Sequence, residues 1–183
     1  PPMALGMAAT IRIGFRIGAN EVAGARTTAL IAFLTTAFVA ISGAIFIYLF
    51  KEVLVGFYTT EQAVMNLSIT LLLFVVFFLF FDATQSVCIG ALRGYKDTKV
   101  PMWLAIFSYW GVGLPTQILF GFGYIGEPMG VYGFWLGLAC GVGTAAILLG
   151  ARLWYVSGNR DLINQLAFQS DRQSVTLPNV DVN

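Results

Sequence analysis

The chain has 183 residues, of which 58% are hydrophobic and only 10% are charged, and its formal net charge is +1. Its mean hydropathy is +0.81. About a quarter of the residues of an ordinary soluble domain are charged, so this composition excludes a soluble globular protein and predicts an integral membrane protein. The sequence has no histidine, which excludes histidine proton relays and histidine metal sites.

The first apolar segment covers residues 1–19 and is predicted to be the last part of a membrane helix. It starts in the middle of a hydrophobic run, without an initiator Met or a cleavage-site pattern. We therefore expect the chain to be the C-terminal part of a longer polypeptide. Arg12 and Arg16 lie one helical turn apart near the end of this segment. They either anchor the helix end by snorkelling or serve as a conformational lock or lipid contact.

Four longer apolar runs follow, each long enough to cross a bilayer. The predicted spans cover residues 27–50, 62–92, 100–124 and 129–152. After them the composition becomes polar, and residues 156–183 are predicted to form a cytoplasmic tail that is partly disordered, from Ser174 onward. One surface-lying helix is expected in this tail because it contains a small apolar cluster. The cluster consists of Leu162, Ile163, Leu166 and Phe168.

The span over residues 62–92 contains one acidic residue, Asp82. At about 1.5 Å per helical residue, Asp82 lies roughly 16 Å from the basic residue Arg93. That is near the middle of a hydrocarbon core of about 30 Å. An ionised carboxylate there costs at least about 2.5 kcal/mol. Asp82 is therefore expected to face a protein cavity or a partner, and it is the first candidate for a residue that binds a proton or a cation.

Aromatic and polar side chains flank Asp82 and are candidates for the lining of the same cavity. On a helix, Phe78 lies one turn before the acid on the same face, and Gln85 and Ser86 lie on the turn after it. Phe81 precedes it directly. Aromatic rings offer flat apolar surface and attract cations. Gln85 and Ser86 serve either this cavity or as packing contacts to neighbouring helices.

Two of the spans contain small residues in patterns that affect helix packing. In the third span, Gly113 and Pro115 are predicted to interrupt the helix, because proline removes a backbone hydrogen bond. The kink either acts as a hinge or only sets the shape of the helix. In the last span, glycines recur every four residues, which predicts a face that another helix can approach closely. These glycines are Gly133, Gly137 and Gly141.

The charged residues divide between the two ends of the predicted spans. One side receives Arg12, Arg16, Arg26, Arg93, Lys96, Lys99, Arg152 and Arg160. The other side receives Lys51 as its only basic residue. By the positive-inside rule the first side is cytoplasmic, and so is the C-terminus. Within the basic connection, Arg93, Lys96 and Asp97 are expected to fix the loop rather than to touch a substrate.

The sequence contains no motif typical of an enzyme. It has no paired carboxylates, metal-ligand spacing, nucleophile with a base or phosphate loop, so we expect neither an enzyme nor a cofactor. It also lacks a basic aromatic surface for nucleic acid. A buried acid that holds a proton, a metal cation or a cationic solute, but not two at once, makes these ligands exclusive. If the ligands prefer different conformations, this exclusion produces antiport.

Several groups of residues, in the same order and with the same spacing, resemble helices eight, ten, eleven and twelve of the MATE multidrug efflux transporters, in the NorM-type branch. These groups are Ala9–Gly14 with Ile17–Ala19, Phe81–Gln85 with Gly90–Thr98, Ser108–Trp110 with Gly113–Thr116, and Gly130–Gly137. The resemblance covers about residues 1–155. It implies an all-α membrane protein of twelve helices in two lobes, of which this chain is a truncated helix plus four spans of the C-terminal lobe.

The resemblance also implies a function. The complete protein would be a secondary active antiporter of the bacterial inner membrane, multi-pass in the lipid bilayer, whose partner lobe is the missing N-terminal one. It would export drugs and other small organic cations in exchange for Na⁺ or H⁺. By this resemblance Asp82 falls on the acid implicated in cation binding and is the candidate Na⁺ ligand. Where many relatives have a tyrosine one turn before that acid, this chain has Phe78, so one hydroxyl ligand is missing.

Two other functions stay open at this point. A lipid-linked oligosaccharide flippase of related architecture would be expected to carry several basic residues inside its spans, and none lies deep here. A non-transporting membrane scaffold would use Asp82 only as a packing contact between helices.

Overall fold

The computed structural model describes residues 2–175 of the chain, as a bundle of long helices. In chain order the elements are α1 (Pro2–Gly18), α2 (Val22–Gly56), α3 (Gln62–Gly94), α4 (Lys99–Ile106), the π-helix η1 (Phe107–Gly113), α5 (Leu114–Gly121), α6 (Val131–Gly158) and α7 (Arg160–Val175). No strand occurs in this part of the chain. The predicted all-α class is therefore confirmed.

Four helical segments are long and apolar enough to cross a membrane, as the sequence predicts. They are Val22–Gly56, Gln62–Gly94, Lys99–Gly121 and Val131–Gly158. The first extends several residues past the predicted span at both ends, and the last runs six residues beyond residue 152. The reason is that an apolar run marks only the part of a helix inside the hydrocarbon, whereas the helix continues into the interface with its charged residues.

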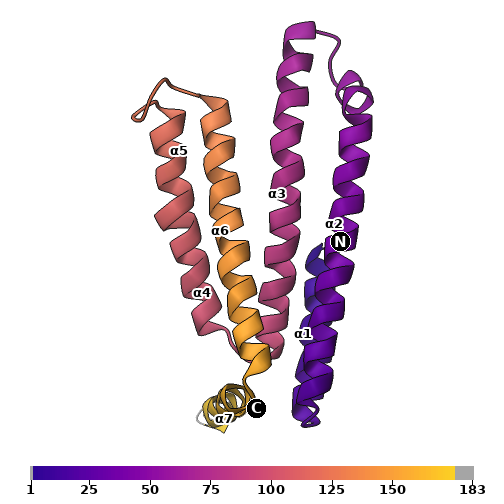
Figure 1. The fold of residues 1–183 in the computed structure, drawn as a ribbon, viewed down its shortest axis with the longest axis vertical. Helices are drawn as coiled ribbons and strands as arrows, with labels where there is room; N and C mark the ends of the chain where they lie inside the picture. Colours follow the sequence, from indigo (N-terminus) through magenta and orange to yellow (C-terminus); the bar gives the residue numbers. More distant parts are fainter. Residues whose placement is uncertain (1, 176–183) are drawn as a thin grey trace, which may run out of the picture.

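The helices form two groups that meet along α3 and α6 (Figure 1). Helices α1, α2 and α3 pack together, and α4, η1 and α5 pack along α6. Helix α7 lies across the lower end of the bundle in Figure 1. The main buried cluster joins the lower halves of the long helices to α7. It includes Ile13, Ala29, Val87, Leu92, Leu149, Val156 and Ile163.

Helix α7 contains the apolar cluster predicted for the polar tail, but it packs against the bundle rather than lying free on its surface. Ile163 is fully buried, and Leu162 and Leu166 pack against the same core. The side chain of Phe168 lies outside the described residues. The segment predicted to be disordered begins at Ser174, which belongs to α7, and its residues 176–183 are not described.

The predicted glycine face of α6 is confirmed as a close helix contact. A Cβ atom added at Gly133 would lie 2.6 Å from the backbone nitrogen of Gly121 in α5. A Cβ atom at Gly141 would lie 3.0 Å from the Cα atom of Gly113, the last residue of η1. Any larger side chain at these positions would push α5 and η1 away from α6.

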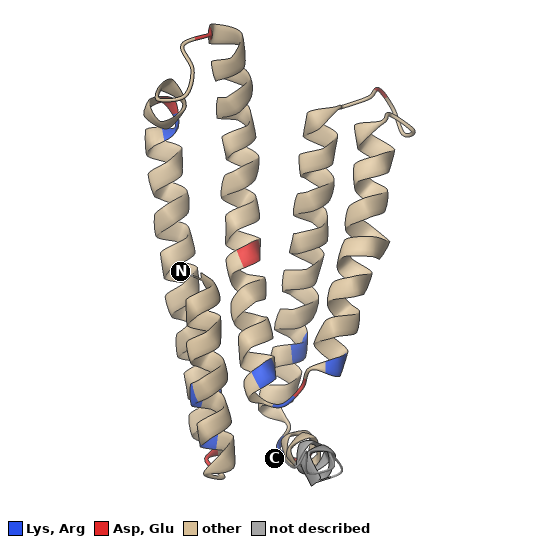
Figure 2. Ribbon diagram, turned by 180° about the vertical axis from the view of Figure 1, so that it is seen from behind, with Lys and Arg blue, Asp and Glu red and all other residues tan. Residues whose placement is uncertain are grey.

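The charges are unequally divided between the two ends of the bundle (Figure 2). Lysine and arginine gather at the end that holds the α1–α2, α3–α4 and α6–α7 connections, which we call the basic end. The opposite end holds the α2–α3 and α5–α6 connections, where the acids Glu61 and Glu127 lie. The three basic connections thus share one face of the bundle, as the sequence predicts.

Candidate functional site

Asp82 lies on α3, well away from either end of that helix, and is the only acidic residue in it. The side chain is partly buried, and it makes no hydrogen bond or ion pair with another described residue. The carboxylate oxygens are therefore available as acceptors for a proton or a cation.

Gln85, one turn after Asp82, is tied to the π-helix. Its side chain is 7% exposed, and its Oε1 atom accepts a hydrogen bond from the hydroxyl of Tyr109 at 2.9 Å. Ser86 lies on a different contact, because its backbone carbonyl oxygen faces α1 and would be 2.8 Å from a Cβ atom at Gly6. The side chain of Gln85 therefore contacts η1, whereas the backbone of Ser86 lies against α1.

The two aromatic candidates both lie toward α6. The ring of Phe78 meets that of Trp135 edge to face, with centroids 6.5 Å apart. The ring of Phe81 packs at van der Waals distance from the position that a Cβ atom would take at Gly143. These contacts join α3 to α6 on the turns around Asp82. That Phe78 and Phe81 line a solute cavity stays a prediction.

The helix interruption predicted at Gly113 and Pro115 takes the form of a π-helical segment. Gly113 ends η1, and Pro115 is the second residue of α5, after Leu114. Because Pro115 has no N–H to donate, the regular α-helical pattern is already relaxed in the turn that precedes it. Single π-turns occur frequently at functional sites. Here the segment carries Tyr109 toward Gln85, while its role as a hinge stays a prediction.

A buried ion pair fixes the α3–α4 connection. The Nε atom of Arg152 in α6 donates to Oδ2 of Asp97 at 2.8 Å, and the Asp97 side chain is 1% exposed. The backbone N–H of Asp97 also donates to the carbonyl of Leu92. Removing one partner of such a pair costs about 3–5 kcal/mol in the free energy of unfolding.

The two basic residues predicted for the same connection lie differently. Arg93 is exposed, and Lys96 adopts a positive φ of 61°.

Sequence reasoning missed two of these residues, Tyr109 and Arg152. Each had a signal. Tyr109 is the only tyrosine in the segment 99–121, and Arg152 is the only charged residue in α6. A lone polar group within an apolar span usually has a specific partner. For Arg152 the obvious partner is Asp97, the only acid in the basic α3–α4 connection.

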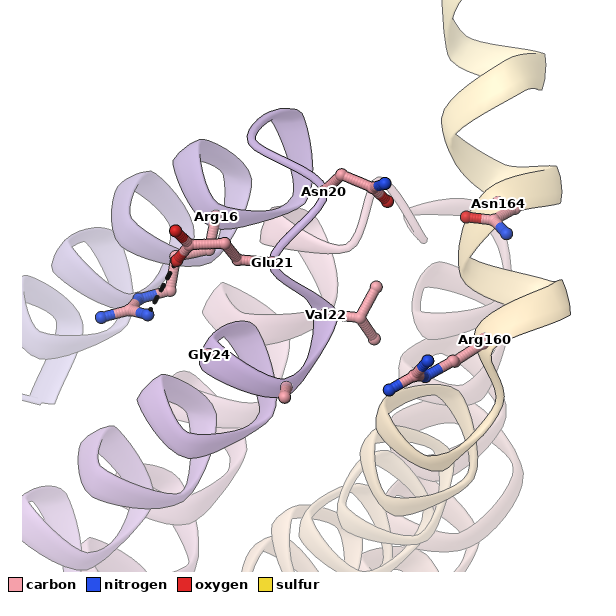
Figure 3. Close-up of a pocket in the computed structure, with 8 residues that line it drawn as sticks. Arg16, Asn20, Glu21, Val22, Gly24, Arg160 and Asn164 are labelled. Atoms are coloured by element: carbon pink, nitrogen blue, oxygen red, sulfur yellow. Dashed lines mark hydrogen bonds and ion pairs between the residues drawn. The ribbon is translucent and has the colours of Figure 1, made fainter.

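A polar cavity of about 460 Å³ lies at the basic end, between the α1–α2 turn and α7 (Figure 3). Its walls are formed by Arg16, Asn20, Glu21, Val22, Ala23, Gly24, Arg160 and Asn164. Figure 3 shows Arg160 extending from α7 toward the start of α2. Arg16 is already paired with Glu21, at 3.2 Å. The cavity is remote from Asp82 in the fold and is not part of the same site.

No cluster of three or more His, Cys, Asp or Glu side chains suited to a metal ion occurs within the described residues. At this site the described part of the chain offers a cation one carboxylate, that of Asp82. The amide oxygen of Gln85, one turn away, already accepts a hydrogen bond from Tyr109. Further oxygen ligands would be needed around Asp82 for a complete cation site.

Comparison with known proteins decides the family. The MatE family profile matches residues 1–119. The chain belongs to the MatE family of multidrug efflux transporters. The multidrug resistance protein MdtK of Proteus mirabilis is 37% identical over 161 residues, which cover 87% of this chain and 35% of that protein. The multidrug resistance protein NorM of Vibrio cholerae is 38% identical over 162 residues, with 87% and 35% covered. The predicted NorM-type resemblance is thus confirmed.

Solved MatE-family structures share the fold. The crystal structure of the eukaryotic MATE transporter AtDTX14 superimposes with a TM-score of 0.77 at 24% identity, over 90% of this chain and 37% of that one. An inward-facing multidrug resistance MATE family transporter of the MOP superfamily gives 0.70 at 19% identity, over 85% and 36%. The chain spans about a third of the length of its relatives, which confirms the predicted architecture of a partial MatE lobe.

Proposed function

We propose that this chain forms most of the C-terminal lobe of a secondary active antiporter in a bacterial inner membrane. The antiporter exports organic, often cationic, compounds in exchange for Na⁺ or H⁺, and the N-terminal lobe is supplied by the rest of the polypeptide. The observation that supports this most is Asp82, an acid far from both ends of an apolar helix and without a partner among the described residues.

The proposed coupling follows from competition for this carboxylate. A proton neutralises Asp82, whereas Na⁺ or an organic cation requires its charged form. One carboxylate holds only one of these ligands at a time, so binding of one expels another. If the ion and the drug prefer different conformations of the transporter, the gradient of the ion drives export of the drug. The rings of Phe78 and Phe81 would supply apolar contact for a variable solute.

Gln85 is proposed to position α3 at this site. Its hydrogen bond to Tyr109 holds the turn after Asp82 against η1. Because π-helical turns occur frequently at functional sites, we expect this contact to relay a change at Asp82 to the third span. The proposal treats Tyr109 and Gln85 as positioning residues, not as ligands of the ion.

Two observations bear on the alternative functions, a lipid-linked oligosaccharide flippase and a membrane scaffold. The lysines and arginines lie at the ends of the helices and not inside the spans (Figure 2), which disfavours a flippase for a pyrophosphate-linked lipid. An acid used only to pack helices would be hydrogen-bonded to one of them, whereas Asp82 has no such bond to a described residue. Both observations favour the antiporter.

The test is Asp82→Asn in the full-length protein. We expect the variant to insert normally and to lose cation-driven efflux of a fluorescent organic cation, because an amide neither binds a proton at physiological pH nor carries charge. Efflux is measured in reconstituted vesicles with a Na⁺ gradient or a pH gradient imposed separately, which also identifies the coupling ion. Glu127→Gln, in the α5–α6 connection, is the matched control and should transport normally. Undiminished efflux by Asp82→Asn would refute the proposed role.

A further inference from the structure

A second cavity, of about 580 Å³, lies between α2 and α6 toward the basic end, with α3 behind it. It is lined by Arg26, Thr27, Ala29, Leu30 and Phe33 of α2, Gly150, Leu153, Trp154 and Ser157 of α6, and Cys88 of α3. We call it the α2–α6 groove. Leu30 is 55% exposed and Trp154 is 72% exposed, so the groove opens on the outer surface of the bundle and not into its core.

The lining of the α2–α6 groove changes from polar to apolar along its length. Arg26 and Ser157 lie nearest the helix ends at the basic end, and Leu30 and Phe33 lie one and two turns further into the bilayer. At about 1.5 Å per residue, Arg26 and Phe33 are roughly 10 Å apart along α2. The groove therefore suits a molecule with a charged group at one end and a hydrocarbon chain at the other.

The charge of that molecule follows from Arg26. Its guanidinium carbon lies 5.5 Å from the centroid of the Trp154 ring, and it forms no ion pair with a described residue. Its donors remain available to an anion, while an organic cation would be repelled. The groove lies on membrane-spanning helices, where the surrounding solvent is lipid.

We propose that the α2–α6 groove binds one anionic phospholipid. Its headgroup phosphate would contact Arg26 beside Trp154, and one of its acyl chains would lie along Leu30 and Phe33. Arginine paired with phosphate and an aromatic ring at the headgroup level are the contacts that membrane interfaces favour. This site is separate from Asp82, and the proposal does not depend on the transport activity proposed above.

The glycine in the groove provides a way to test the occupant. A Cβ atom added at Gly150 would meet no atom within 4 Å, so the side chain of Gly150→Leu starts in open space within the groove. Gly43, on α2 outside the groove, also has no atom within 4 Å of an added Cβ. Gly43→Leu is therefore a matched control, and Lys99→Gln is the control for removing one exposed charge at the basic end.

The experiment measures lipid retained by the full-length protein, using native mass spectrometry from micelles doped with dioleoyl-phosphatidylglycerol or dioleoyl-phosphatidylcholine. We expect the wild-type protein to retain one phosphatidylglycerol in preference to phosphatidylcholine. Gly150→Leu should lose this retention. Arg26→Gln should weaken phosphatidylglycerol binding about fivefold and leave phosphatidylcholine unchanged. Gly43→Leu and Lys99→Gln should behave as the wild type.

Two results would overturn the proposal. One is retention of both lipids alike by the wild type, or of phosphatidylglycerol by Gly150→Leu. The other is a melting temperature of lipid-free Gly150→Leu below that of Gly43→Leu, since this would show that protein from the rest of the polypeptide already fills the groove.

Discussion

Two aspartates of this chain have opposite surroundings, and the difference agrees with the proposal that Asp97 is structural and that Asp82 binds a ligand. Asp97 is buried and bonded to Arg152, so its charge is compensated in the folded protein and it is not available to a ligand. Asp82 is partly buried in a membrane span and has no partner among the described residues. An uncompensated acid in such a place is costly, and binding of a proton or a cation, as proposed above, would offset this cost.

The hydrogen bond between Tyr109 and Gln85 is expected to stabilise the contact of α3 with η1. Tyr109→Phe leaves the buried Gln85 acceptor unpaired, so we expect a loss of about 0.6–2 kcal/mol in the free energy of unfolding. Unfolding in detergent with increasing denaturant measures it. Tyr124→Phe, whose side chain is 74% exposed in the α5–α6 connection, is the control. Equal stability of the two variants would show that the bond contributes nothing.

Tyr95, just after α3, is expected to make stability depend on alkaline pH. Its hydroxyl is buried without a hydrogen-bond partner in the described structure, and burial raises the pKa of Tyr95 to about 12 although nearby Arg26 opposes this. An unfolded tyrosine has a pKa of about 10. The unfolded chain thus releases this proton first, and stability should fall as the pH rises from about 10 to about 12.

Tyr95→Phe removes this dependence. We expect its melting temperature to match that of the wild type near neutral pH and to exceed it near pH 11, because phenylalanine cannot ionise. Thermal unfolding across this pH range measures the difference. Tyr155→Phe, with an exposed side chain, should follow the wild-type curve. A parallel decline of the wild type and Tyr95→Phe would contradict the prediction.

At the scale of elements, the bilayer made the spans predictable. Four apolar runs predicted four membrane helices because the hydrocarbon thickness sets their length. The pattern did not predict how far α2 and α6 continue beyond the hydrocarbon. It also did not predict the π-helix. A π-helix holds about one residue more per turn than an α-helix, and a span that is apolar all round has no alternation of polar and apolar faces to reveal this change. Without η1, the side-chain register that brings Tyr109 to Gln85 could not be derived.

The contact of α5 with α6 depends on the absence of side chains. Gly133→Ala would place a Cβ atom 2.6 Å from a backbone nitrogen of α5, and backbone cannot rotate away as a flexible side chain can. We expect a destabilisation of about 1–3 kcal/mol. Gly43→Ala has free space around its Cβ and should be neutral or more stable by up to about 1 kcal/mol. Melting temperatures in one detergent compare them, and shifts of the same sign and size would refute the packing argument.

At the scale of the whole molecule, the distribution of charged residues predicts the orientation of the bundle in the membrane. The three basic connections lie at one end of the bundle and the acidic connections at the other (Figure 2). One basic connection alone would be weak evidence for the orientation. Two spans separate each basic connection from the next, so all three must lie on the same side of the membrane, and all three carry basic residues. The fold, the spans and the position of Asp82 within a span could be predicted from the sequence. The Arg152–Asp97 pair was missed. The sequence marks each residue as a lone charge of its kind, but they are 55 positions apart, and their contact depends on how α6 returns to the basic end.

This orientation predicts which connections a membrane-impermeant maleimide reaches. In a cysteine-free background of the full-length protein, Glu61→Cys and Glu127→Cys should be labelled in intact cells, because the acidic end faces outward. Lys99→Cys and Arg160→Cys should be labelled only after the membrane is permeabilised, since basic connections are retained in the cytoplasm. Labelling of all four in denatured protein controls for reactivity. If Lys99→Cys and Glu127→Cys were labelled from the same side, the third span would not cross the membrane, and Asp82 would lose the setting in which a lone acid can couple an ion to a drug.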